Sequence, residues 1–276
     1  MNFDFDKATR VEPIGDGRYA ARVHDGWDIG GNANGGYLLA LVAGAASKAA
    51  ARALPVAISC HYLGPINDAD VVINTQVVKS GKSFATVHVT MWAGERVIVT
   101  AIVTCGNELP GGTLHHSTHV APDLPSFESC VPRAPSTSAT VETTHRDDAP
   151  PMPGLMSNID VRLHPSDTGF ATGIPSGHAR VRGWCAFRDA RPVDALALTL
   201  FCDAFPPAMF NLAGAPGWVP TVQLSWYLRG LPDGAPVRGE FVTTQIANGM
   251  FEEDGTLWTE SGMLLAQSRQ LALLPR

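Results

Sequence analysis

A glycine-rich run that leads straight into an uncharged apolar segment constrains the fold of this 276-residue chain more than any other feature. Four glycines and two asparagines lie between Gly30 and Gly36, and the residues that follow are mostly Ala, Leu and Val. An asparagine can cap a helix by accepting from its first free N–H groups, and Pro55 would end the helix. Because no charge appears before Ser47, the segment predicts a helix from Gly36 to about Ala53 that other structure encloses.

The glycine-rich run gives this predicted helix an unusual start. Free N–H groups and the positive end of the helix dipole meet at the first turn, where they could face an anion or a polarised carbonyl oxygen. The alternative interpretation is a tight turn before a core helix, because glycine-rich turns are common. The pattern leaves both open.

Segments rich in β-branched residues follow, joined by short turns. Residues 84–92 alternate, with Phe84, Thr86, His88, Thr90 and Trp92 on one side, as in a half-buried strand. Together with the preceding strand, these segments indicate an antiparallel meander. The predicted strands are 17–24, 56–63, 71–78, 84–92 and 97–104.

The second half repeats this order after a proline-rich stretch. Residues 107–153 contain eight prolines and many Ser and Thr, which favours a linker or surface excursion. The domains are therefore predicted as 1–106, 107–153 and 154–276. A second helix is expected from Pro192 or Val193 to Phe205, ended by Pro206 and Pro207, and 251–255 is expected to be a turn. The predicted strands are 158–163, 179–187, 221–228, 237–246, 256–260 and 263–274.

Weak self-similarity supports an internal duplication. The residues His61-Tyr62-Leu63-Gly64 resemble Trp226-Tyr227-Leu228-Arg229, and Tyr227 lies 165 residues after Tyr62. The same spacing relates Ser83 to Asn248, in corresponding turns. Chance similarity between two β meanders is the competing interpretation.

Composition excludes several function classes. The net charge is -6, so a nucleic-acid partner is not expected. No signal peptide and no uninterrupted apolar run of about 18 residues is found, so no membrane partner is expected. The odd number of cysteines without paired spacing predicts reduced thiols and a cytoplasmic location; the five are Cys60, Cys105, Cys130, Cys185 and Cys202. All but Cys130 lie in apolar segments and are expected in the core.

Three motifs together resemble the bacterial acyl-CoA thioesterase II-like family: the run Gly30 to Leu38, the segment Cys60 to Pro65, and the hairpin Ser80 to Phe84. The resemblance covers nearly the whole chain apart from the proline-rich stretch. It implies an α+β double hotdog: two curved antiparallel sheets, each wrapping a central apolar helix, joined into one long sheet. It also implies a homodimer or a higher homo-oligomer.

In that family an Asp, a Thr and a Gln from the second hotdog hold the catalytic water. The resemblance carries these roles onto Asp203, Thr221 and Gln270, with Gln267 as the fallback if the register shifts. The first half lacks such a set, which predicts one active site per chain. Asn34, Gly35, Gly36 and His61, which belong to the first-half motifs, are the expected substrate-binding residues.

Physical reasoning supports Asp203 in part. A carboxylate on an otherwise apolar helix needs partners, and apolar surroundings would raise its pKa and make it a better base. Thr221 and Gln270 are neutral hydrogen-bonding residues suited to orienting a water. The alternative is that Asp203 caps a turn near Pro206. Asp194, near the helix start, is expected only to favour the helix dipole.

Other constellations are weaker. The cluster of His115, His116 and His119 has no carboxylate or thiol at ligand spacing, so no metal is expected, and no cofactor is predicted. A core or interface histidine is favoured over a base for His61. Asp28 beside the glycine-rich run fits a polar contact or a turn. No Gly-x-Ser-x-Gly, P-loop or dinucleotide motif occurs.

The sequence therefore favours hydrolysis of acyl-CoA thioesters to a free acid and CoA. A water held by the Asp, Thr and Gln would attack the carbonyl, and a helix-start amide such as that of Gly36 would stabilise the oxyanion. The alternative is an acyl or acyl-CoA binding protein without catalysis. A hotdog hydratase or dehydratase is disfavoured, because such enzymes place a His near the helix and neither predicted helix contains one.

Overall fold

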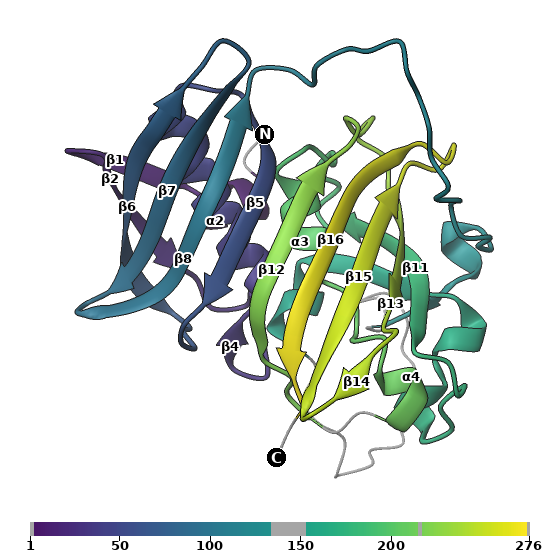
Figure 1. Ribbon diagram of the computed structural model, residues 1–276. Coiled ribbons are helices and arrows are strands. Elements are labelled where there is room, and N and C mark those ends of the chain that lie inside the picture. The colour runs from purple at the N-terminus through teal and green to yellow at the C-terminus, as the bar shows by residue number, and fades with distance from the viewer. Residues whose placement is uncertain (1–2, 134–152, 215–216, 275–276) are drawn as a thin grey trace.

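One long antiparallel sheet dominates the computed structural model, which describes residues 3–133, 153–214 and 217–274 (Figure 1). It has 14 strands. From one edge to the other, the first half contributes β1 (Val11–Gly15), β2 (Arg18–Val23), β6 (Ala69–Ser80), β7 (Phe84–Ala93), β8 (Arg96–Gly106) and β5 (Leu54–Tyr62). The second half continues with β12 (Thr221–Leu228), β16 (Leu264–Leu273), β15 (Met250–Trp258), β13 (Val237–Val242), β11 (Arg180–Phe187), β10 (Ile159–Leu163) and β9 (Val131–Pro132), while β14 (Ile246–Ala247) pairs with β15.

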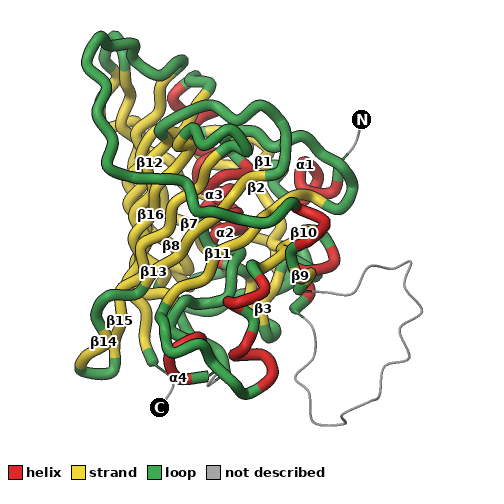
Figure 2. Tube along the Cα trace, turned by 90° about the vertical axis from the view of Figure 1, so that its right-hand side faces the viewer, coloured by secondary structure: helices red, strands yellow, loops and turns green. Residues whose placement is uncertain are grey.

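The helices are few and short apart from one. They are α1 (Asp4–Ala8), α2 (Gly35–Ala50), α3 (Ala197–Phe201) and α4 (Phe210–Ala213), with 3-10 turns η1 (Phe127–Ser129), η2 (Gly154–Ser157), η3 (Pro165–Asp167) and η4 (Gly169–Thr172). A separate two-stranded ribbon of β3 (Asp28–Ile29) and β4 (Asn32–Ala33) precedes α2. Seen from the side in Figure 2, α2 and α3 lie on one side of the central strands.

The two halves meet at the antiparallel pair β5–β12, where Ser59 lies opposite Ser225. Moving outward from this pair, the first half runs β8, β7, β6, β2 and β1, and the second half runs β16, β15, β13, β11 and β10. The strand order is therefore repeated about the centre of the sheet. An internal duplication predicts such an arrangement, and the proposed spacing of 165 residues relates β7 to β15.

Helix α2 follows the sequence prediction closely. The Asn34 side chain accepts from the Tyr37 N–H at 3.0 Å and caps the helix. Eight consecutive residues, 36–43, are buried, which covers every face of the helix and explains the lack of charge there. The helix packs against β5, β6, β7, β8 and α3.

Helix α3 is much shorter than predicted, since only residues 197–201 are α-helical. Val193 instead forms a bridge to Gly234, and Asp194 Oδ1 accepts from the Ala197 N–H at 2.8 Å, which starts the helix late. After Phe201 the chain continues in turns of the i to i+3 type, such as the bond from Asp203 N to Leu200 O at 3.1 Å. Asp203 therefore lies just beyond the helix.

The prediction of a turn at 251–255 was wrong, because β15 runs without a break from Met250 to Trp258. Alternate residues face inward, and Phe251, Glu253 and Leu257 are buried. The outward Asp254 forms an ion pair with Arg269 of β16. The neighbouring strand thus stabilises acidic residues whose clustering in the sequence is typical of a turn. The predicted strand 237–246 divides into β13 and β14.

Part of the proline-rich stretch packs on the second half. Val131 and Pro132 form β9 beside β10, the Trp184 indole donates to Pro125 O at 3.0 Å, and the Arg162 guanidinium lies 4.4 Å from the centre of the Phe127 ring. Residues 134–152 of the predicted linker lie outside the described residues.

The five cysteines are free and buried, and Cys130 lies in the interior like the other four. In the described ranges, no helix combines the length and the apolar character needed to cross a membrane.

The Tyr37 hydroxyl links α2 to the N-terminal segments. It donates to Ala8 O at 2.9 Å and accepts from the His24 N–H at 3.1 Å, and the side chain is fully buried. We expect Tyr37→Phe to lower the free energy of unfolding by about 1–2 kcal/mol, because these two backbone groups lose a partner in the interior. Denaturant unfolding of both proteins measures the difference. An unchanged midpoint would mean that these groups are satisfied elsewhere.

Candidate active site

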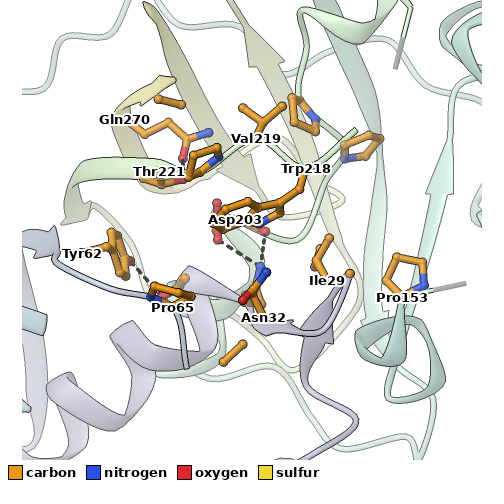
Figure 3. Close-up of a pocket in the computed structure, with 18 of the residues that line it drawn as sticks. Ile29, Asn32, Tyr62, Pro65, Pro153, Asp203, Trp218, Val219, Thr221 and Gln270 are labelled. Atoms are coloured by element: carbon orange, nitrogen blue, oxygen red, sulfur yellow. Dashed lines mark hydrogen bonds between the residues drawn. The ribbon is translucent and has the colours of Figure 1, made fainter. Parts of the chain in front are cut away.

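A cavity of about 790 Å³ lies between the start of α2, the chain after α3 and the start of β12 (Figure 3). Most of its lining is apolar, with aromatic rings from Phe170, Phe205, Phe210 and Trp218. The polar and charged lining residues are few, and they include Asn34, Tyr62, Arg133, Asp203, Thr221 and Gln270. Such a mainly apolar cavity with convergent polar groups is the usual form of a small-molecule site.

Asp203 is held at the cavity by the start of α2. Its Oδ2 accepts from Asn34 Nδ2 and from the Gly36 N–H, both at 3.0 Å. Asn34 Nδ2 also donates to the Asp203 carbonyl at 2.7 Å. Because the other end of the Asn34 amide caps α2, its orientation is fixed. The first half of the chain thus positions an acid from the second half.

Two glycines make this approach possible. A Cβ on Gly35 would lie 2.9 Å from Asp203 Oδ2 and 3.1 Å from the Tyr62 ring. A Cβ on Gly36 would lie 2.5 Å from Leu200 O and 2.8 Å from Thr199 O. These glycines have ordinary helical backbone angles. Glycine is therefore required here by the close packing of α2 against α3 and Asp203, and not by an unusual backbone conformation.

Thr221 and Gln270 form a second polar group on the cavity wall. They lie on the paired strands β12 and β16, and Thr221 Oγ1 donates to Gln270 Oε1 at 2.9 Å. Gln270 Nε2 donates in turn to Glu253 Oε1 at 3.0 Å. Glu253 lies on β15 and is 4% exposed. Sequence reasoning missed Glu253 because the residues around it were predicted to be a turn; an inward position in an alternating strand was the signal.

Burial controls the electrostatics of both acids. It raises the pKa of Asp203 to about 6, although the Gly36 and Gly35 amides and the Asn34 side chain oppose the shift. It raises the pKa of Glu253 to about 8, with the Ala208 amide opposing and the charge of Asp203 adding to the rise. Two neighbouring carboxyl groups therefore titrate in different ranges, as at many sites of proton transfer.

The structure brings together most residues that the sequence singled out. Asp203, Thr221 and Gln270 line the same cavity (Figure 3). Asn34 and Gly35 line it as well. Gln267, the fallback for Gln270, does not line it. Residues an odd number apart on a strand face opposite sides, so the Gln267 side chain faces away from the cavity. It accepts from Arg229 Nε at 2.6 Å.

Two candidate binding residues need correction. His61 is exposed and does not line the cavity, since its neighbours Cys60 and Tyr62 take the inward side of β5. Gly36 does not line the cavity either, and its N–H already donates to Asp203. The hypothesis that this amide stabilises an oxyanion therefore does not fit, because the amide has a carboxylate partner.

The other polar residues that the sequence singled out lie in turns, at the start of a helix or in an exposed loop. Asp28 Oδ2 accepts from the Gly31 N–H at 2.9 Å, which is turn chemistry. Asp194 pairs with Arg191 and accepts from the N–H of Ala197, the first residue of α3. His115, His116 and His119 lie exposed in a loop. Within residues 3–133, 153–214 and 217–274, no group of three His, Cys, Asp or Glu side chains has an arrangement that could hold a metal ion.

Known proteins resemble the chain over its whole length. A model of the acyl-CoA thioesterase N-terminal domain matches residues 23–106, and a model of the C-terminal domain matches residues 129–274. An uncharacterized protein of Mycobacterium tuberculosis is 30% identical over 299 residues, covering 100% of this chain and 99% of the relative.

Solved structures share the fold. A crystal structure from Thermobifida fusca, described as a thioesterase II, superposes with a TM-score of 0.85 at 29% identity and covers 99% of this chain and 98% of its own. A protein from Alicyclobacillus acidocaldarius described as having the hotdog fold gives 0.82 at 23% identity, over 100% and 99% of the two chains. An acyl-CoA thioesterase II from Mycobacterium marinum gives 0.69 at 16% identity, over 98% of each chain.

Proposed function

We propose that this chain, which belongs to the acyl-CoA thioesterase family, hydrolyses acyl-CoA thioesters to a free acid and CoA. The observation that carries the proposal is the convergence of Asp203, Thr221 and Gln270 on one mainly apolar cavity. An apolar acyl chain would occupy that cavity. In this proposal α2 and α3 are the central helices of two hotdog units, and the single site lies where the units meet.

In the proposed reaction Asp203 is the general base. Asn34 and Gly36 occupy its Oδ2, so Oδ1 takes the proton from a water that Thr221 and Gln270 hold. The water oxygen bonds to the thioester carbonyl carbon, and the C–S bond then breaks. CoA leaves as the thiolate and receives the proton, so the products are the acid and the free thiol.

Release of free thiol from acyl-CoAs ranging from acetyl to palmitoyl tests this proposal. We expect turnover with a preference among chain lengths, because the cavity is finite, and equal amounts of acid and thiol by mass spectrometry. Binding measured by calorimetry without any thiol release would instead support the non-catalytic binding protein. If the protein shows no binding and no thiol release, both the hydrolase and the binding protein are excluded.

The rate should fall in acid. Because burial raises the pKa of Asp203 to about 6, its base form is lost below that pH, whereas an ordinary aspartate would stay ionised to about pH 4. We expect kcat/KM to decline about tenfold per pH unit below 6. Initial rates in buffers of constant ionic strength measure this, with enzyme returned from pH 5 to pH 8 as the control for denaturation. A flat profile down to pH 5 would contradict the assignment of the base.

Self-association through the outer sheet face belongs to the same proposal. Exposed apolar side chains stand on three central strands: Ile102 on β8, Tyr227 on β12 and Leu271 on β16. A second copy would cover them. Light scattering of the purified protein gives the mass, and Tyr227→Lys should shift it toward the monomer. A monomeric wild type at all concentrations would exclude this part.

A further inference from the structure

Glu253 is the buried acid at the site that the proposed reaction does not use. Both carboxylate oxygens accept hydrogen bonds: Oε1 from Gln270 Nε2 at 3.0 Å and Oε2 from the Ala208 N–H at 2.5 Å. Taking a carboxylate out of water is unfavourable, and a neutral residue would fill the same space. The presence of the acid at an inward position of β15 therefore calls for a reason beyond packing.

The hydrogen bonds run in one direction from the cavity to Glu253. The Thr221 hydroxyl donates to Gln270 Oε1, and Gln270 Nε2 donates to Glu253 Oε1. An amide has its acceptor and its donors at different atoms. Because Glu253 Oε1 accepts at this contact, the Gln270 nitrogen faces Glu253 and the Gln270 oxygen faces Thr221.

This direction fixes what Thr221 can offer to a water. A hydroxyl has a single hydrogen, and that of Thr221 points to Gln270. Its oxygen is left with lone pairs, so it can accept from the water but not donate to it. A water that donates one hydrogen to Asp203 and the other to Thr221 has its own lone pair free for the thioester carbonyl.

We propose that Glu253 is a positioning residue for thioester hydrolysis: by accepting from Gln270 it fixes the direction of the amide, and so makes Thr221 an acceptor toward the attacking water. This inference rests on the proposed function. Burial and the nearby charge of Asp203 raise the pKa of Glu253, although the hydrogen bonds from the Ala208 amide and the Gln270 side chain oppose the rise.

The isosteric variant Glu253→Gln separates polarity from shape. The introduced side chain can still accept from the Ala208 N–H, but its NH₂ would then face Gln270 Nε2, donor against donor. The Gln270 amide would turn over, and the Thr221 hydrogen would point into the cavity. We expect kcat to fall by about tenfold or more, with KM within about twofold and an unchanged melting temperature.

Glu253→Asp gives the opposite balance, since it keeps an acceptor but packs less well. The proposal expects Glu253→Asp to retain more kcat than Glu253→Gln, whereas a purely structural role expects the reverse order. The comparison still separates the two roles if one of the variants is partly unfolded, because kcat is calculated from the concentration of folded protein in each sample. Glu240→Gln, a partly buried acid on β13 that does not line the cavity, serves as the matched control and should behave as wild type.

A double-mutant cycle tests whether Glu253 acts through Gln270. In a Gln270→Met background, Glu253→Gln should cause no further loss of kcat. If the loss of kcat in the double variant equalled the product of the two single losses, Glu253 would act independently of Gln270 and the inference would be overturned. If the wild type hydrolyses thioesters and Glu253→Gln is equally active, only this inference fails. If the wild type hydrolyses none, the proposed function fails first.

Discussion

Asp203→Asn should lower kcat for acyl-CoA hydrolysis by about 10²- to 10⁴-fold, the usual contribution of a general base. The amide has the same shape, and its oxygen can still accept from Asn34 Nδ2 and the Gly36 N–H, so binding of the substrate should persist. What is lost is an atom that can take a proton from water. Thiol release under saturating substrate, together with calorimetry of a non-hydrolysable thioether analogue, measures the two effects separately.

The same variant should gain stability above neutral pH. Because the folded pKa of Asp203 is raised from 3.8 to about 6, the folded protein binds more protons than the unfolded chain between these values, and wild-type stability rises as pH falls through this window. Ionised Asp203 thus destabilises the fold at pH 8 by about 1–3 kcal/mol. We expect Asp203→Asn to melt higher than wild type at pH 8, with the difference shrinking toward pH 4.

Asp194→Asn provides the matched control. Asp194 lies at the other end of α3, and the side-chain oxygen of asparagine can accept from the Ala197 N–H in the same way. The activity of the Asp194→Asn variant should stay close to that of the wild type. An Asp203→Asn enzyme with wild-type kcat would remove Asp203 from the reaction, whatever its effect on stability.

Gly36→Ala should destabilise the whole fold, by about 3 kcal/mol or more, because the added methyl group meets backbone atoms. Leu200 O would be 2.5 Å away, Thr199 O 2.8 Å and Leu200 Cα 3.0 Å, and backbone cannot rotate aside as a side chain can. Separating α2 from α3 would also move the Gly36 N–H away from Asp203. Activity should therefore fall with stability, which thermal unfolding and thiol release measure together.

Gly44→Ala, eight residues further along the same helix, is the contrasting case. The nearest atom to its added methyl would be Val11 Cγ2 at 4.0 Å, so there is room. Alanine has the higher helix propensity, and we expect a gain of about 0.5–1 kcal/mol. If Gly36→Ala were as stable as Gly44→Ala, the close packing of α2 on α3 would not exist in solution.

Much of the strand order follows from local pattern. Residues 84–92 form a strand because they alternate, and 35–50 form a helix because Asn34 caps a continuous run of helix-compatible apolar residues. Both patterns act over a few residues and need no knowledge of distant partners. The assignment of Asp203, Thr221 and Gln270 came from a family resemblance, and the structure places these three residues around one cavity.

Where partners lie far away in the sequence, local pattern failed. The stretch around Glu253 looks like a turn because its acids have no neutralising neighbours nearby, yet Arg269 and Gln270 supply partners from the adjacent strand. His61 was expected to bind substrate because it belongs to a first-half motif, although strand alternation places it on the outer face. The second helix begins late because the long-range bridge of Val193 to Gly234 occupies its predicted start.

The sequence by itself determined the enclosed helix, the meander of strands, the family and the residue types available for chemistry, because periodicity, capping and motif spacing are local properties of the chain. Only the tertiary structure decided that the Gly36 amide serves a carboxylate instead of a substrate, and that a buried glutamate lies behind Gln270. Both depend on contacts between segments more than 15 residues apart. Such contacts form when apolar surfaces pack, and local sequence carries no record of which backbone amide or side chain will then be brought within hydrogen-bonding distance.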